Sequence, residues 1–196
     1  MIEKILLELQ AVKLSPDSPF TWTSGIKSPI YCDNRKMISY PEQRKAIVQR
    51  LCEKVKKHSN VELIAGTATA GIPWAAWVAD ELNLPMVYVR SESKSHGLKN
   101  SIEGSCSPNQ RAILIEDLVS TGKSSINAWE KLNEAKVEVL EIASIFTYGL
   151  ADETFLDKGL KTSSLANLNS LLTCALEMDL LNEDQVRIIR GWKEKI

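Results

Sequence analysis

The chain has 196 residues, of which 44% are hydrophobic and 25% charged, a balance typical of a folded globular protein and not of a disordered one. The 24 basic side chains nearly cancel the 25 acidic ones, so we expect no nucleic-acid partner bound through charge alone. No apolar run approaches the ~18 residues of a membrane span and no segment resembles a secretory signal, so we expect no membrane partner and a cytoplasmic location.

The first forty residues are predicted to form a lobe of their own. Apolar residues recur at helical spacing from Ile2 to Leu9, which predicts an amphipathic helix over residues 2–11. The following stretch, residues 14–36, contains three prolines, which exclude a regular helix, and three aromatic residues, which a linker does not need. We therefore expect residues 1–40 to form an ordered hood that packs on another part of the chain.

Residues 41–150 alternate between helical and strand patterns. Pro41 suits the first turn of a helix, which continues to about residue 58. Further along the chain, strands are predicted at 61–67, 85–90, 111–118 and 137–149, helices at 71–82 and 120–136, and a polar loop at 91–104. Strands joined by helices of this length pair in parallel through right-handed crossovers. We therefore predict an α/β fold with an open, doubly wound, mostly parallel sheet, in which ligands bind beyond the carboxyl ends of the strands.

The remaining residues, 151–196, are predicted to be helical. Two helices are expected, at about 165–177 and 183–194. Asn182 is placed to cap the second of them, with Gln185 three residues later as in a capping box. The hood, the α/β core and this helical segment are together interpreted as a single domain over residues 1–196.

An acidic pair stands at the end of a predicted inner strand, in the sequence ILIEDLVSTGKSS of residues 113–125. The two carboxylates, Glu116 and Asp117, repel each other, and burying either one without a partner costs several kcal/mol. Two vicinal hydroxyl groups of a ribose would be suitable partners, because each carboxylate oxygen accepts a hydrogen bond. A magnesium ion bridging the same sugar would also relieve the charge.

The residues from Ser120 to Ser124 follow this pair and open the next predicted helix. The start of a helix offers free backbone N–H groups and the positive end of the dipole, which together bind phosphate. Gly122 permits a close approach, and the hydroxyl groups of Ser120, Thr121 and Ser124 are further donors. The motif thus indicates a sugar phosphate, with a plain N-capped helix as the alternative. A P-loop is excluded because the first glycine of its pattern is missing before Gly122.

These motifs resemble those of the type I phosphoribosyltransferase family, which uses 5-phosphoribosyl 1-pyrophosphate (PRPP). Residues 20–35 are similar to the orotate-side segment of the members that act on orotate, residues 66–73 to the pyrophosphate loop, and residues 89–97 to the start of the flexible catalytic loop. The resemblance implies a glycosyltransferase that moves ribose 5-phosphate from PRPP to orotate in pyrimidine synthesis. It also implies Mg²⁺ as the cofactor, and a homodimer whose flexible loop, at about residues 91–104, is shared across the interface.

The resemblance also implies a set of site residues. PRPP would be bound by Arg90, Lys94, His96, Glu116, Asp117, Leu118, Val119, Ser120, Thr121, Gly122, Lys123 and Ser124, of which 119–124 cradle the 5′-phosphate. The pyrophosphate loop would be Thr67, Ala68, Thr69 and Ala70, and orotate would contact Ser120 and Ser24. Lys94, His96 and Asp117 would be the catalytic residues. No direct protein ligand of the metal is implied, because magnesium is expected to bind through PRPP.

The chemistry of these residue types agrees with the implied reaction. Loss of pyrophosphate from C1 of ribose builds negative charge on the leaving group, so fixed positive charge accelerates it. Arg90 offers a fork for phosphate oxygens, Lys94 a movable point charge, and His96 a donor able to pass a proton. A solvated polar turn is the alternative for this segment.

The sequence departs from the family pattern at several positions. Lys123 stands where the phosphate loop usually carries glycine, and we expect its ammonium group to contact the phosphate. Tyr148 replaces an arginine that binds orotate, and Trp74 replaces a frequent histidine beside the pyrophosphate loop. Two other functions stay open from the sequence: a non-catalytic regulator that binds PRPP on the same fold, and a transferase that acts on another base.

Overall fold

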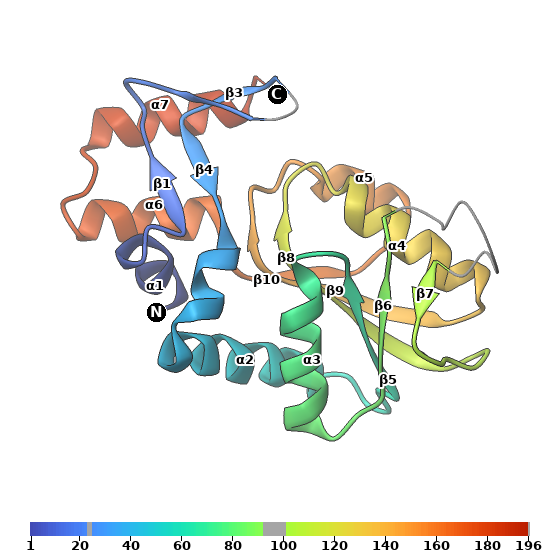
Figure 1. Ribbon diagram of the computed structural model, residues 1–196. Coiled ribbons are helices and arrows are strands. Elements are labelled where there is room, and N and C mark those ends of the chain that lie inside the picture. The colour runs from blue at the N-terminus through green and yellow to red at the C-terminus, as the bar shows by residue number, and fades with distance from the viewer. Residues whose placement is uncertain (23–24, 92–100, 196) are drawn as a thin grey trace.

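A six-stranded sheet forms the centre of the computed structural model, which describes residues 1–22, 25–91 and 101–195 (Figure 1). The strand order is β10-β9-β8-β5-β6-β7, and the neighbouring strands are parallel except for the β6–β7 pair at one edge. The strands are β5 (Leu63–Thr67), β6 (Met86–Val89), β7 (Ile102–Glu103), β8 (Arg111–Val119), β9 (Glu138–Thr147) and β10 (Thr162–Asn167). The predicted open and mostly parallel sheet is confirmed.

Helices cover both faces of this sheet, as the prediction of a doubly wound fold requires. One face carries α2 (Pro41–Val55) and α3 (Gly71–Leu82), and the other carries α4 (Lys123–Glu134) and α5 (Asp152–Asp157). Alternate residues of β8 divide between the two cores, because side chains along a strand point to opposite faces. Ile113 and Ile115 belong to the α2/α3 core, whereas Leu114 belongs to the α4/α5 core. Burial on both faces explains why this strand reads as a continuous apolar run.

A smaller lobe built from both ends of the chain stands beside the sheet (Figure 1). In this lobe β1 pairs with β4 and β2 with β3, both antiparallel, and the 3₁₀-helix η1 follows. Its elements are α1 (Ile2–Glu8), β1 (Val12–Leu14), β2 (Phe20–Thr21), β3 (Lys27–Ser28), β4 (Ile30–Cys32), η1 (Asn34–Ser39), α6 (Leu168–Glu177) and α7 (Glu183–Lys193). The indole N–H of Trp192 donates to the carbonyl oxygen of Lys27 over 2.8 Å. The C-terminal helices therefore brace the N-terminal hood.

The C-terminal segment is less helical than its sequence indicates. Residues 162–167 form β10 at the edge of the sheet, so the helix expected at 165–177 begins only at Leu168. Four of the six β10 residues are serine, threonine or asparagine, which is why its sequence lacks the apolar run of an inner strand. The short helix α5 was also not predicted. The capping box of α7 is confirmed, since Asn182 and Gln185 each accept the other's backbone N–H.

A short strand also lies in the segment predicted as a polar loop. Ile102 and Glu103 form β7 and pair antiparallel with Val89 and Tyr88 of β6. A strand of two residues is too short to show the alternation from which strands are predicted. The segment expected to be a loop, residues 91–104, therefore includes a strand of the sheet near its end.

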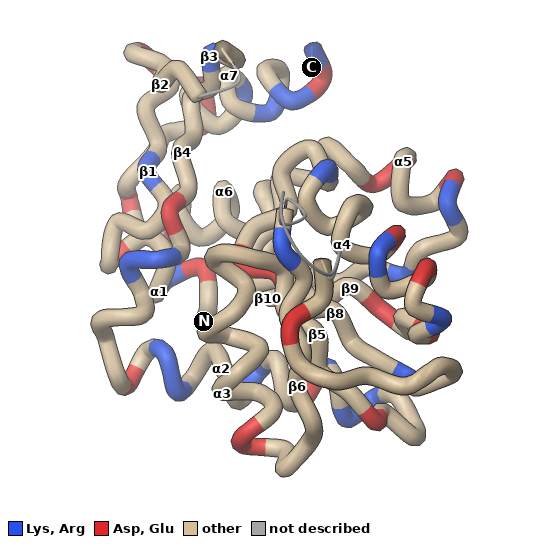
Figure 2. Tube along the Cα trace, turned by 45° about the vertical axis from the view of Figure 1, so that its right-hand side comes forward, with Lys and Arg blue, Asp and Glu red and all other residues tan. Residues whose placement is uncertain are grey.

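The helices of the described ranges are too short or too polar to cross a membrane. The longest of them, α2, has 15 residues, which rise about 22 Å, less than the ~30 Å of a hydrocarbon core. In the view of Figure 2, basic and acidic residues are interspersed over both lobes.

Candidate functional site

A cavity of about 290 Å³ opens at the carboxyl ends of β5 and β8. Three segments far apart in the sequence line it: the end of the hood strands, the loop after β5, and the end of β8 with the first turn of α4. The lining residues are Cys32, Asp33, Arg35, Ala68, Thr69, Ala70, Glu116, Asp117, Leu118 and Ser124. The rule that ligands bind beyond the strand ends of an open α/β sheet predicted this position.

Close packing of α3 on β8 brings the loop after β5 beside the acidic pair. A Cβ atom at Gly71 would lie 2.7 Å from the carbonyl oxygen of Ile115 and 3.4 Å from Cα of Glu116, so only glycine permits this approach. The N–H of Ala68 donates to the carbonyl oxygen of Val89 over 2.9 Å, which ties the loop to β6 as well. Residues 68–70 of the predicted pyrophosphate loop and the acidic pair thus border one cavity, whereas Thr67 is buried at the end of β5 and does not line it.

Glu116 is held in one orientation by three donors. One carboxylate oxygen, Oε2, accepts hydrogen bonds from the hydroxyl groups of Ser124 and Ser125, each over 3.2 Å. The other oxygen, Oε1, accepts the backbone N–H of Asp117 over 3.1 Å. Only 4% of the residue is exposed. Burial, with the neighbouring charge of Asp117 as a second cause, raises the pKa of Glu116 well above its ordinary value.

Asp117 is more exposed than Glu116, and a hydrogen bond from a hood residue holds its backbone in position. Its carbonyl oxygen accepts a 2.6 Å hydrogen bond from the amide nitrogen of Asn34, a residue with no exposed surface. The amide oxygen of Asn34 accepts in turn from the thiol of Cys32 over 3.2 Å. Burial also raises the pKa of Asp117. Two carboxyl groups with raised pKa values favour a ligand that donates hydrogen bonds or carries positive charge, because either stabilises the ionised form.

The turn after β8 has a backbone conformation that favours glycine. Gly122 has a φ of +75°, and a Cβ atom there would lie 2.8 Å from Cβ of Ala151 and 2.9 Å from the Phe155 ring. Immediately after it α4 begins at Lys123, whose side chain is exposed, as is that of Thr121. The free N–H groups at the start of α4 lie in the turn that follows the acidic pair, as expected for a phosphate site.

Two members of this turn differ from the expectation that their side chains are free. The hydroxyl group of Ser124 is engaged by Glu116, so it orients the acidic pair in this structure. The side chain of Val119 is buried in the α4/α5 core, so a phosphate contact from Val119 would come from its backbone. Leu118 lines the cavity, and Ser120 is partly exposed beside it.

Arg90 follows β6 but does not line the cavity. One guanidinium nitrogen, Nη1, lies 3.3 Å from a carboxylate oxygen of Glu103. The backbone carbonyl oxygen of Arg90 accepts a 2.6 Å hydrogen bond from the ammonium group of Lys131 on α4. The same ammonium group also donates to the carbonyl oxygen of Ser91 over 3.0 Å. The backbone N–H of Arg90 donates to the carbonyl oxygen of Ser101 over 2.8 Å. Three other site residues from the sequence, Ser24, Lys94 and His96, lie outside the described residues.

The two aromatic departures from the family pattern are buried and do not line the cavity. Tyr148 packs on Trp22 and Trp192 with ring centroids 5.0 and 6.3 Å away, so it joins β9 to the hood and to α7. Burial strongly raises the pKa of its hydroxyl group. Trp74 has no exposed surface and meets the Trp77 ring edge-on at 5.2 Å. Both residues therefore act through packing in this structure.

The sequence did not single out the hood residues at this site. Cys32, Asp33 and Arg35 line the cavity, and Asn34 lies behind them on Asp117. All four belong to residues 20–35, whose resemblance to the orotate-side segment of the family was the available signal, although no residue among these four was named from it. Lys131 was also missed, because in the sequence it is one of several charged residues on a helix.

Comparison with known proteins gives the family. The phosphoribosyl transferase domain family matches residues 35–168. The orotate phosphoribosyltransferase of Staphylococcus saprophyticus is 50% identical over 198 aligned positions, which cover 100% of this chain and 98% of that protein. The chain belongs to the orotate phosphoribosyltransferase family.

Other members of the family agree in sequence and in fold. The orotate phosphoribosyltransferase of Listeria monocytogenes is 51% identical over 96% of this chain and 92% of its own length. The crystal structure of orotate phosphoribosyltransferase from Aeropyrum pernix superimposes with a TM-score of 0.80 at 28% identity and covers 93% of this chain and 100% of that one. The predicted type I phosphoribosyltransferase fold is thereby confirmed.

The residues at this site fit a magnesium ion only in part. In the described ranges no group of three or more His, Cys, Asp or Glu residues could hold a metal ion by itself. Glu116 and Asp117 offer the hard carboxylate oxygens that magnesium prefers, but the ion keeps several positions for water and substrate phosphates. The donor set therefore suits an ion that is shared with a phosphorylated substrate.

Proposed function

We propose that the chain transfers the ribose 5-phosphate group of PRPP to orotate and releases orotidine 5′-monophosphate and pyrophosphate. The observation that carries this proposal is the single cavity lined by both the acidic pair and the loop after β5. A ribose needs hydrogen-bond acceptors for its hydroxyl groups, and its pyrophosphate group needs backbone donors nearby. Orotate as the acceptor is supported by the names of relatives about 50% identical over the full chain.

Glu116 and Asp117 would accept hydrogen bonds from the 2′- and 3′-hydroxyl groups of the ribose. In the reaction the bond from C1 to the pyrophosphate oxygen breaks, a bond from C1 to orotate nitrogen forms, and positive charge develops on the sugar. A carboxylate at Asp117 stabilises that charge and holds the ring in position, so its effect is larger in the transition state than in the ground state. The Asn34 hydrogen bond to the backbone of Asp117 supports this role.

Residues 119–124 would hold the 5′-phosphate at the start of α4, with Lys123 as an additional charge. Thr67, Ala68, Thr69 and Ala70 would hold the pyrophosphate group through backbone N–H groups. Lys94 and His96 would stabilise its developing charge, and so would Arg90 once its guanidinium group leaves Glu103. Orotate would contact Ser120 and Ser24.

The cofactor, assembly and location follow from the family resemblance. Magnesium would bind with PRPP, where it neutralises charge on the pyrophosphate group, and the acidic pair would hold it through the sugar. The active form would be a homodimer in which the loop at about 91–104 is shared between the two active sites. The reaction would take place in the cytoplasm.

A spectrophotometric assay tests the proposed reaction. Purified protein is incubated with PRPP, magnesium and orotate, and the loss of orotate absorbance is followed, with adenine as a control base in a parallel incubation. We expect turnover of orotate and no turnover of adenine. Turnover of another base alone would contradict the choice of acceptor, and binding of PRPP without turnover of any base would identify a non-catalytic regulator.

A further inference from the structure

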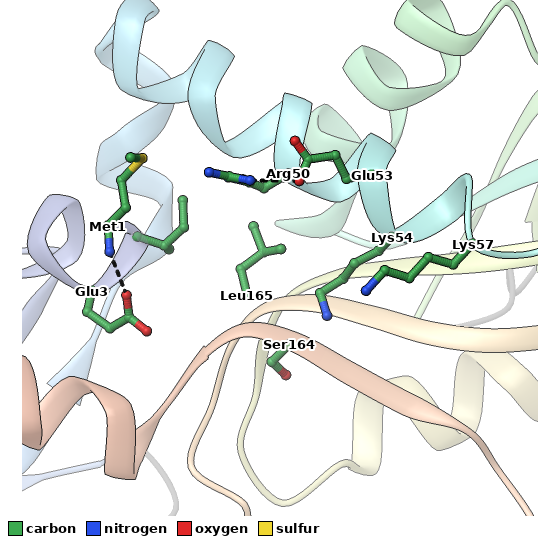
Figure 3. Close-up of a pocket in the computed structure, with 9 residues that line it drawn as sticks. Met1, Glu3, Arg50, Glu53, Lys54, Lys57, Ser164 and Leu165 are labelled. Atoms are coloured by element: carbon green, nitrogen blue, oxygen red, sulfur yellow. Dashed lines mark hydrogen bonds and ion pairs between the residues drawn. The ribbon is translucent and has the colours of Figure 1, made fainter.

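A second cavity, of about 300 Å³, lies between α1, α2 and the edge strand β10 (Figure 3). It shares no lining residue with the cavity of the acidic pair. Ile2 and Leu165 give it an apolar part. The complete lining is Met1, Ile2, Glu3, Arg50, Glu53, Lys54, Lys57, Ser164 and Leu165.

Three cations line this cavity from the side of α2. Arg50 and Lys54 lie one turn apart on the same face of α2, and Lys57 follows in the turn after this helix. Figure 3 shows the side chains of Lys54, on α2, and Lys57, just beyond its end, extending toward β10. Like charges at this spacing repel each other and destabilise a helix. A gain elsewhere, such as a bound anion, would offset that cost.

The two carboxylates of the cavity are engaged by other groups. The Oε2 atom of Glu53 accepts a 2.8 Å hydrogen bond from the guanidinium group of Arg50. The Oε2 atom of Glu3 accepts from the amino group of Met1 over 3.2 Å. Figure 3 marks this contact with a dashed line. Neither carboxylate is therefore placed to neutralise the lysines.

The ammonium groups of Lys54 and Lys57 have no hydrogen bond or ion pair within residues 1–22, 25–91 and 101–195. Glu141 attracts Lys54 through space, but its oxygens are held by the His58 ring nitrogen at 2.5 Å and by the hydroxyl group of Ser163. Partial burial lowers the pKa of Lys54, Glu141 opposes that shift, and Lys57 adds to it. Two neighbouring ammonium groups, one of them partly removed from water, thus lack a close counter-charge.

The helix dipole accounts for only part of this arrangement. The C-terminal end of a helix favours basic residues, which explains a lysine in the last turn of α2. Arg50, which lies more than a turn before the end, has its own partner in Glu53. The dipole does not explain why the partly buried Lys54 lies in a cavity with an apolar floor.

We propose that this cavity binds a small organic phosphate. Its phosphate group would lie between Lys54 and Lys57, because lysine binds phosphate as a movable point charge. Its organic part would cover Ile2 and Leu165. A volume of about 300 Å³ is at the lower end of small-molecule sites and exceeds what a bare phosphate ion fills. The assignment does not depend on the reaction proposed for the other cavity.

Methyl NMR of methionine-labelled protein tests this proposal, because it reports separately on a methionine at the cavity and on one outside it. Met1 lines the cavity and its ε-methyl group supplies the signal, whereas Met37 on η1 is buried and serves as a reference. The probes are adenosine 5′-monophosphate and inorganic phosphate, each titrated at constant ionic strength. Binding of either probe at the other cavity does not disturb the test, because the readout is the Met1 signal.

Two double variants separate a built site from general attraction to a basic helix. Lys54→Gln with Lys57→Gln removes two charges from the cavity, and Lys45→Gln with Lys56→Gln removes two charges from α2 or its C-cap outside the cavity. We expect a saturable Met1 shift with adenosine 5′-monophosphate, weakened at least about tenfold by the first pair and less than about twofold by the second.

Three outcomes would overturn the proposal. The first is a Met1 signal that does not saturate with either probe. The second is equal weakening by the two double variants, which indicates only a diffuse ion atmosphere around α2. The third is inorganic phosphate binding as tightly as adenosine 5′-monophosphate, which would leave the organic part without a role.

Discussion

The two cavities hold like charges in opposite ways. At the end of β8, Glu116 and Asp117 are fixed by hydrogen bonds from the strand, from α4 and from the hood. At the C-terminal end of α2, the ammonium groups of Lys54 and Lys57 have no such contacts among the described residues. Burial disfavours the charged form at both places, raising the pKa of the carboxyl groups and lowering that of Lys54. The difference indicates that the acidic pair is oriented for a reaction, whereas the lysines are suited to binding alone.

Removing the carboxylate at Asp117 should have the largest effect of the changes considered. Asp117→Asn keeps the shape of the side chain but loses the negative charge that we propose stabilises the developing charge on ribose. We expect kcat/KM for PRPP to fall by at least ~10²-fold, the scale of one lost electrostatic contact in a transition state. Steady-state kinetics measure it, with Asp80→Asn on the exposed surface of α3 as the control. A fall of less than about threefold would remove Asp117 from the catalytic residues.

Lys131 differs from the lysines of the second cavity because its ammonium group donates hydrogen bonds to the carbonyl oxygens of Arg90 and Ser91. Lys131→Met should release the end of β6 and with it the position of Arg90. Hydrogen bonds from a charged group contribute about 1.5–3 kcal/mol, so we expect the KM for PRPP to rise roughly tenfold while kcat changes less than about threefold. Lys131→Arg should restore part of the affinity.

The control for this change is Lys161→Met, which removes an exposed lysine far along the chain. A fall in kcat at unchanged KM would contradict the positioning role, because Lys131 is not expected to contact the reacting atoms. Equal effects of the Lys131→Met and Lys161→Met changes would show that loss of positive charge alone is responsible.

Local patterns were sufficient to predict the sheet and the acidic turn. The apolar run of β8 is buried on both faces, and α3 extends over Gly71–Leu82 as its spacing indicated. The acidic pair lies near the end of β8, and the polar turn before α4 follows directly in the same chain segment. Each of these features depends on neighbours within a few positions, which is the range that hydrophobic periodicity and turn chemistry report.

Contacts between distant segments could not be predicted in the same way. Asn34 and Asp117 are 83 residues apart, and Lys131 and Arg90 are 41 apart. The local sequence around these residues does not indicate their partners, because asparagine in a turn and lysine on a helix surface are ordinary. β10 was missed for a related reason: the edge position that permits its polar residues is a property of the assembled sheet.

The pH dependence of stability separates the two cavities further. Burial raises the pKa of Glu116, so the folded protein holds this proton more tightly than the unfolded chain does. Stability is then lost as the pH rises from the ordinary value of 4.5 toward the raised pKa. Glu116→Gln removes one of the two titrations and should make this loss shallower. Urea unfolding between about pH 4.5 and 7.5 measures it, with exposed Glu134→Gln as the control. Parallel curves for wild type and Glu116→Gln would contradict the prediction.

Lys54 should give the opposite trend with the smallest amplitude. Burial lowers its pKa, so the unfolded chain holds the proton more tightly, and stability is gained as the pH rises through the lowered pKa toward 10.5. Lys54→Gln should therefore lack this gain. Near neutral pH it should be more stable than wild type by only about 0.2–0.5 kcal/mol, the size of one relieved like-charge pair on a helix. Urea unfolding from about pH 7 to 10.5, against Lys45→Gln, measures both effects. A large loss of stability in Lys54→Gln would mean that its ammonium group is already well compensated without a ligand, and the contrast between the two cavities would then fail.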